Sequence, residues 1–161
     1  MDQTLIYLTM VLGGLLMASL PFGVYMGGSM AMGIIDPTST ELLTLLIVST
    51  LFVSFCANVG IFSAIQYNSC GKVKNTRQIA GNAGLSTLII FVSLLLAIFV
   101  PGLKKIVTNL FSPVTDQFAV QSFGYSYFLF WGALYGIVTG GFLSANCGDD
   151  TTTTPANALP K

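Results

Sequence analysis

Four stretches of the sequence contain no charged residue, and each is longer than the roughly 20 residues that a helix needs to cross a bilayer. They cover residues 3–35, 42–71, 78–103 and 117–148. Lipid offers the backbone no hydrogen-bond partners, and these runs lack the alternation of a membrane β-barrel strand, so we expect helices. The sequence therefore predicts an all-α membrane protein, a bundle of about four transmembrane helices.

We place the spans near residues 4–33, 42–66, 80–102 and 121–145. They form one domain over residues 1–148, and a polar tail over residues 149–161 follows it. Pro21 lies near the middle of the first span and is expected to kink it. A short re-entrant piece followed by a span is the alternative for this segment. Ser39 or Thr40 is expected to cap the second helix.

The composition removes several classes of function. Only 7% of the 161 residues are charged, against about 25% in soluble domains. Six Lys and Arg balance six Asp and Glu, which leaves no basic field for nucleic acid. The absence of His removes the commonest general base and the commonest transition-metal ligand. We therefore expect no enzymatic activity, no cofactor, no metal and no nucleic-acid partner, and we identify no small-molecule substrate.

The three cysteines are Cys56, Cys70 and Cys147. An odd number at these spacings predicts neither a disulfide framework nor a zinc site. Cys70 and Cys147 are expected at helix ends on one side of the membrane, as free thiols, with reversible acylation as the alternative. Cys56 is interpreted as a small apolar filler within its span.

Half of the basic residues lie in one loop between the second and third spans: Lys72, Lys74 and Arg77. By the positive-inside tendency this loop faces the cytoplasm, together with both chain termini if all four segments cross. Lys104 and Lys105 fall on the other side, where residues 104–116 are expected to lie along the interface as a short amphipathic helix. The three loop cations are predicted contacts for a partner or for lipid headgroups.

Small residues recur at every fourth position in two spans and share a helix face in each. The residues are Ser19, Gly23, Gly27 and Ala31 in the first span, and Gly132, Gly136, Gly140 and Ser144 in the last. In lipid, such faces allow helix backbones to approach closely, so both sets are predicted to be helix-packing residues. Contact within one bundle or with a neighbouring subunit is the plainer interpretation, and a tightly packed rotor or channel is the alternative.

The spans contain no carboxylate and no cation, which are the usual marks of an ion or proton pathway. Ser54 and Asn58 share a face of the second span and are expected to form an interhelical hydrogen bond worth about 1 kcal/mol. Lining a polar passage is the alternative for them.

Aromatic residues gather at the entry to the last span, among them Tyr125, Tyr127 and Trp131. Amphipathic rings favour the headgroup region, so they predict an interfacial belt. A partner-binding patch is the second interpretation, compatible with the first.

The stretch from Asn58 to Asn75, NVGIFSAIQYNSCGKVKN, with the spans around it, resembles small multi-span membrane proteins of large icosahedral double-stranded DNA viruses of algae. In that group, minor capsid proteins embedded in an internal bilayer connect this membrane to the capsid above it. The resemblance implies a structural protein of the viral inner membrane, with capsid proteins as partners.

The sequence thus predicts a non-enzymatic multi-pass membrane protein that anchors a larger assembly to a lipid bilayer through other protein subunits. The setting implied by the resemblance is a virion. The alternatives are a small channel or transporter subunit and an accessory subunit of a respiratory or ATPase complex.

Overall fold

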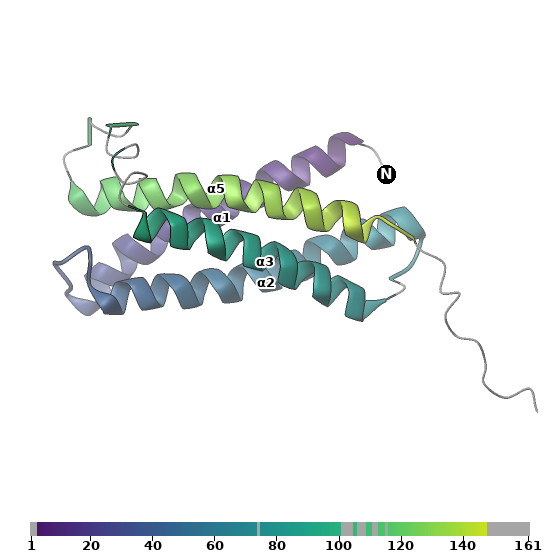
Figure 1. Cartoon of the computed structure of the whole chain (residues 1–161), viewed down its shortest axis with the longest axis horizontal. Coiled ribbons are helices and arrows are strands. Elements are labelled where there is room, and N and C mark those ends of the chain that lie inside the picture. The colour runs from purple at the N-terminus through teal and green to yellow at the C-terminus, as the bar shows by residue number, and fades with distance from the viewer. Residues whose placement is uncertain are drawn as a thin grey trace, which may run out of the picture.

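A computed structural model describes residues 3–73, 75–100, 105, 109–110, 113–114 and 116–147 of the chain. Its long helices are α1 (Gln3–Met32), α2 (Thr40–Cys70), α3 (Thr76–Phe99) and α5 (Gln117–Ser144), and they form an elongated bundle (Figure 1). Each of the four is long and apolar enough to cross a membrane. The predicted fold class, an all-α bundle of four membrane-spanning helices, is confirmed, and the chain has the architecture of a multi-pass membrane protein.

The last three helices each begin at a residue whose side chain caps the helix. Ser39, Asn75 and Asp116 accept hydrogen bonds from backbone N–H groups two or three residues further on, at 3.0–3.3 Å. Such caps satisfy donors that have no partner in the first turn of a helix. Ser39, rather than Thr40, therefore caps α2, and the cap at Asn75 lets α3 begin before the predicted span 80–102.

The far ends of α2 and α3 also have local causes. α2 continues through Tyr67 to Cys70, residues that the sequence assigned to the following loop, and it ends where Gly71 takes the left-handed conformation at φ 70°. α3 ends at Phe99 because Val100 is extended, as the residue before a proline tends to be.

The first helix is continuous through Pro21, which lies inside it and is buried. A re-entrant piece followed by a separate span is therefore wrong for α1. Its 30 residues correspond to about 45 Å of helix, longer than the roughly 30 Å hydrocarbon core of a bilayer. Figure 1 shows that the N-terminal part of α1 extends away from the rest of the bundle.

The last helix is the central one. α5 packs along α1 and along α3 and also touches α2, whereas α1 and α3 have no contact with each other in the described part of the chain (Figure 1). Both the start of α1 and the end of α5 lie at the end of the bundle where α2 passes into α3. The loop after α2 and both ends of the helical domain thus share one side.

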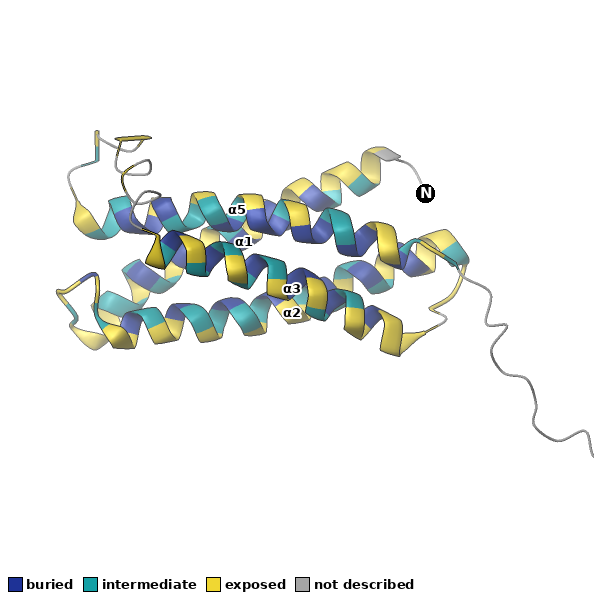
Figure 2. Cartoon of the chain, viewed as in Figure 1, coloured by how far each residue is buried: buried dark blue, intermediate teal, exposed yellow. Residues whose placement is uncertain are grey.

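The core is a narrow strip of buried residues on each helix (Figure 2). The outer faces carry large apolar side chains. On α2 the strip uses every fourth residue from Leu42 through Gln66, and on α1 it includes Met10, Met17 and Tyr25. Phe52, Tyr135 and Phe142 are about 70% exposed on the outside. Large apolar side chains over so much of the surface suit contact with lipid.

Candidate functional site

Four polar side chains of α2 and α3 are buried near the middle of the bundle. Ser54, Asn58, Ser86 and Thr87 are all buried, and we call them the central polar cluster. The side-chain amide of Asn58 donates to Thr87 Oγ1 at 3.3 Å, which joins α2 to α3. The hydroxyl of Ser54 contacts Met17 Sδ on α1, also at 3.3 Å. The expected interhelical hydrogen bond exists at Asn58, and every member of the cluster is uncharged.

The small residues of α5 pack against α3 and α2, and Gly136 lies over this cluster. Gly132, Gly136, Gly140 and Ser144 are all buried. A methyl group added at Gly136 would lie 2.9 Å from the backbone oxygen of Ser86, so the α3 backbone occupies the space that a side chain would need. At Gly140 it would overlap the ring of Phe62 on α2.

The small residues of α1 lie on the opposite side of their helix from the core. Ser19, Gly23, Gly27 and Ala31 are exposed, and nothing lies within 4 Å of a methyl group added at Gly23 or Gly27. We call these four residues the outer α1 face. Ser19, Gly23 and Gly27 each lie two residues beyond a buried residue, which places them about 200° around the helix from it.

The close packing of α1 uses other glycines, which the sequence pattern did not single out. A methyl group at Gly13 would lie 3.0 Å from the Ile137 side chain, and one at Gly14 would lie 3.1 Å from Phe130. The sequence did contain a signal for this packing face, because Met10, Gly13, Gly14 and Met17 follow the spacing of residues on one side of a helix. Within the bundle α1 therefore packs through the face that holds Met10, Gly13, Gly14, Met17 and Tyr25, and the outer α1 face contributes nothing there.

The aromatic residues at the start of α5 divide between the inside and the outside. Tyr125 turns inward, its ring centroid 5.3 Å from that of Tyr25, a buried residue whose hydroxyl donates to the Pro37 carbonyl at 3.2 Å. Tyr127 and Trp131 are exposed and contact each other edge to face at 6.4 Å. The latter two occupy positions suited to lipid headgroups or a partner, whereas Tyr125 links α1 to α5.

Two of the three predicted contact residues of the basic loop, Lys72 and Arg77, are exposed. Lys74 lies outside the described residues, as do Lys104, most of the segment 104–116 and the tail over residues 149–161. Lys105 is exposed.

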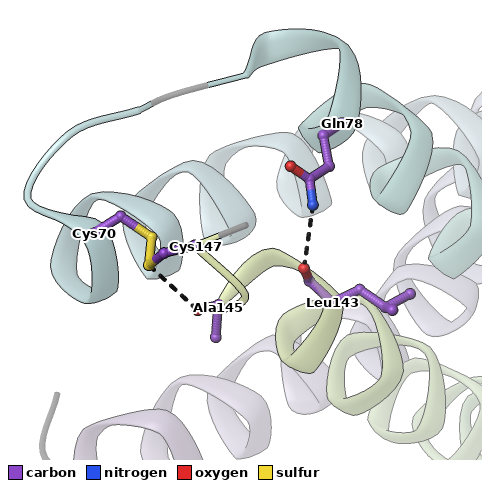
Figure 3. The surroundings of a disulfide bond; sticks show 5 residues. All are labelled: Cys70, Gln78, Leu143, Ala145 and Cys147. Atoms are coloured by element: carbon purple, nitrogen blue, oxygen red, sulfur yellow. Dashed lines mark hydrogen bonds between the residues drawn. A yellow bond between two sulfur atoms is a disulfide. The ribbon is translucent and has the colours of Figure 1, made fainter. Parts of the chain in front are cut away.

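The cysteines contradict the sequence prediction of free thiols. Cys70, the last residue of α2, forms a disulfide with Cys147, just beyond α5, with their Cα atoms 5.7 Å apart (Figure 3). The spacing of 77 residues gave no sign of it, because the two cysteines meet only when α2 and α5 pack with their C-terminal ends at the same side. Cys56 is the free cysteine, and its exposed position faces outward instead of filling the core.

Two side-chain amides reinforce the same end of the bundle. Gln78 Nε2 donates to the Leu143 carbonyl at 3.5 Å (Figure 3). Asn82 Nδ2 donates to Ser144 Oγ at 2.9 Å. The beginning of α3 is thus tied to the end of α5 by hydrogen bonds, beside the covalent link from α2.

The described carboxylates and cations lie in turns, loops or the first turn of a helix and do not converge. Two hydrogen bonds from Thr38, one from its backbone N–H and one from its hydroxyl, hold the pKa of Asp36 below its usual value.

An open groove of about 470 Å³ lies between α1 and α2. Glu41 is its one carboxylate, and the other lining residues are Met32, Thr40, Thr44, Leu45 and Val48. The described residues contain no group of three His, Cys, Asp or Glu suited to a metal ion. Neither the turn that holds Asp36 nor the groove that holds Glu41 pairs an acid with a base.

Comparison with known proteins adds no family to these observations. No protein-family model matches the chain, and no curated protein or solved structure is found to be similar to it.

Proposed function

We propose that this chain is a non-enzymatic structural protein that anchors a larger assembly to the bilayer it spans. The observation that carries the proposal is the outer α1 face, where four small residues leave a helix backbone uncovered by the chain's own bundle. In lipid, helices associate through close backbone approach over small residues. A neighbouring transmembrane helix is the partner that this surface fits.

The chemistry of the interior supports the same role. The central polar cluster holds helices together by neutral contacts, such as the hydrogen bond from Asn58 to Thr87. Asp36, Glu41 and Asp116 lie in turns or in the first turn of a helix, away from the bundle core. A membrane-spanning bundle with such a neutral interior is suited to anchoring other subunits to the bilayer. The inner membrane of a virion is the setting that we propose from the resemblance to algal-virus proteins, with capsid proteins as partners.

The test substitutes a large side chain on the outer α1 face and compares it with the same change elsewhere. Gly23→Leu fills the uncovered face, whereas Gly60→Leu alters an exposed glycine of α2 that likewise has nothing within 4 Å of an added methyl group. Both variants should fold, because neither side chain meets the bundle.

The readout is mass spectrometry of everything that co-elutes with the protein in mild detergent. We expect the wild type and Gly60→Leu to retain their partner subunits and Gly23→Leu to lose most of them. Capsid proteins among the partners would support the virion setting, and energy-transducing subunits would replace it with an accessory role in such a complex. Elution of the wild type as a lone monomer would refute the anchor.

A channel subunit is the second candidate, and one specific observation favours it. Five buried polar atoms have no hydrogen-bond partner in the described part of the chain: Thr50 Oγ1, Asn58 Oδ1, Gln66 Oε1, Ser86 Oγ and Gln121 Oε1. Three of them lie on the inward strip of α2. Unsatisfied groups of this kind are costly in lipid and are expected to bind water or a polar solute.

Liposomes distinguish the two candidates. As an anchor, the purified chain should show proton and potassium leak equal to that of empty vesicles, because its described interior offers no charged group to hold an ion. A saturable, ion-selective flux that disappears in Asn58→Leu would establish the channel instead.

A further inference from the structure

The end of the bundle that carries the disulfide lies outside the apolar part of the helices. Cys70 and Cys147 are half-buried, and the residues around Cys70, namely Asn68, Ser69 and Lys72, are polar and exposed. Gly71 turns the chain out of α2 at this point, with its N–H donating to the Tyr67 carbonyl at 2.9 Å. The two sulfur atoms therefore meet at the membrane surface, where the neighbouring aqueous compartment decides whether they stay bonded.

The separation of the two Cα atoms, 5.7 Å, falls within the range that disulfides normally span. The contacts from Gln78 to Leu143 and from Asn82 to Ser144 hold the end of α5 at this side of the bundle independently of the bond. Folding of the bundle thus places the two cysteines side by side, so their oxidation needs only a suitable compartment.

We infer that the disulfide end of the bundle, with the basic loop and both ends of the helical domain, faces an oxidising compartment such as a secretory lumen, a periplasm or the cell exterior. Disulfides persist in these compartments and are rare in the cytosol, where thiols are kept reduced. Closing the bond transfers two electrons and two protons from the thiols of Cys70 and Cys147 to the disulfide of a thiol–disulfide oxidoreductase. That enzyme's own disulfide is reduced to two thiols in the exchange.

This orientation is opposite to the one that the positive charges suggest, and the charges are nearly balanced. The loop after α2 carries Lys72, Lys74 and Arg77, whereas Lys104 and Lys105 lie between α3 and α5. The loop after α2 thus has only one more cation than the segment between α3 and α5, so the positive-inside tendency favours neither orientation strongly. Acidic residues contribute little to this tendency. The redox requirement of a disulfide is the stricter constraint, and it places Lys104 and Lys105 on the cytosolic side. The inference does not depend on the anchor role.

The first experiment determines the redox state in the native membrane. In a Cys56→Ser background, thiols are blocked with a membrane-permeant maleimide, and the protein is then denatured, reduced and treated with a polymer-linked maleimide that retards it on a gel. We expect two polymer adducts, and none if reduction is omitted. Cys70→Ser or Cys147→Ser in the same background should give no adduct, because the remaining thiol is already blocked. No adduct from the chain with both cysteines would overturn the inference.

The second experiment determines on which side of the membrane Cys70 lies, and it does so in a variant that cannot form the disulfide. In sealed vesicles of known orientation, a membrane-impermeant maleimide should label the single cysteine of the Cys56→Ser, Cys147→Ser variant only from the non-cytosolic face. A cysteine introduced at Ser39, in the turn between α1 and α2, should label only from the cytosolic face. The reverse pattern would overturn the inference. Loss of partner subunits in Gly23→Leu would leave both results unchanged, so the two proposals fail separately.

Discussion

The first and last helices carry the same sequence pattern and use it in opposite ways. On α5, the face with Gly132, Gly136 and Gly140 is buried against α3 and α2. On α1, the face with Gly23 and Gly27 points away from the other three described helices. A series of small residues therefore identifies a face to which a backbone can come close, but it does not say whose backbone that is.

The bulky residues on the other faces explain the difference. On α5 they include Trp131, Tyr135 and Phe142, which point outward and suit lipid. On α1 the fully buried Met17 and Tyr25 fill the centre of the bundle, so the small residues about half a turn away must point outward. The location of the large side chains, rather than that of the glycines, decides which way each helix is turned.

The largest effect is expected from a single methyl group placed on each of the two faces. Gly136→Ala pushes against the backbone oxygen of Ser86 at 2.9 Å and should destabilise the bundle by about 1–3 kcal/mol, as overpacked cores do. Gly23→Ala meets nothing within 4 Å and should leave stability unchanged or raise it by up to about 1 kcal/mol, because Ala favours helix. Unfolding of the purified protein by a denaturing detergent, followed by circular dichroism, measures both. Equal effects would abolish the distinction between the two faces.

A smaller effect is expected beneath the α5 face, at the hydrogen bond from Asn58 to Thr87. Asn58→Leu should cost about 1 kcal/mol, since polar contacts between membrane helices are worth about 0.6–2 kcal/mol. Thr87→Val removes the other partner, and the double variant completes a cycle that isolates the pair. Strict additivity of the two single changes would show that the cluster lies under α5 without joining α2 to α3.

The smallest effect concerns the turn that follows the outer α1 face. Hydrogen bonds from Thr38 lower the pKa of Asp36, so the ionised carboxylate stabilises the folded turn. This contribution is present above the unfolded pKa of about 3.8 and is lost as the pH falls through the lower folded value. Asp36→Asn should remove that pH dependence and, at neutral pH, the contribution itself, which is small because the residue is exposed. Unfolding midpoints measured from pH 5 down to pH 2 provide the check, and identical pH profiles for the two proteins would contradict it.

The fold was predictable because lipid leaves a chain few options. Four long charge-free runs can satisfy their backbone groups in a bilayer only as helices or as a barrel, and the runs do not alternate as barrel strands do. Helix ends were less predictable, since they depend on local chemistry. The Asn75 cap carries α3 out to polar residues such as Thr76 and Arg77, which hydropathy alone assigns to a loop.

The sites were predictable only where a sequence pattern and a tertiary contact coincide. The face of Gly136 and the hydrogen-bonding role of Asn58 follow from spacing and polarity. The pairing of Cys70 with Cys147 does not, because it depends on two helix ends that meet only in the assembled bundle. The inward turn of Tyr125 is of the same kind, since it depends on the position of Tyr25 on α1.

The central position of α5 has a consequence for biosynthesis. The ribosome makes this helix after the other three, yet its packing against α1 and α3, which do not touch each other in the described part of the chain, is more extensive than that of α2. Until residues 117–144 have entered the membrane, the glycines of α1 that receive Phe130 and Ile137 face lipid, and Cys70 has no partner. Nascent chains truncated before α5 should therefore remain loosely associated helices, so the core closes only after α5 has been made.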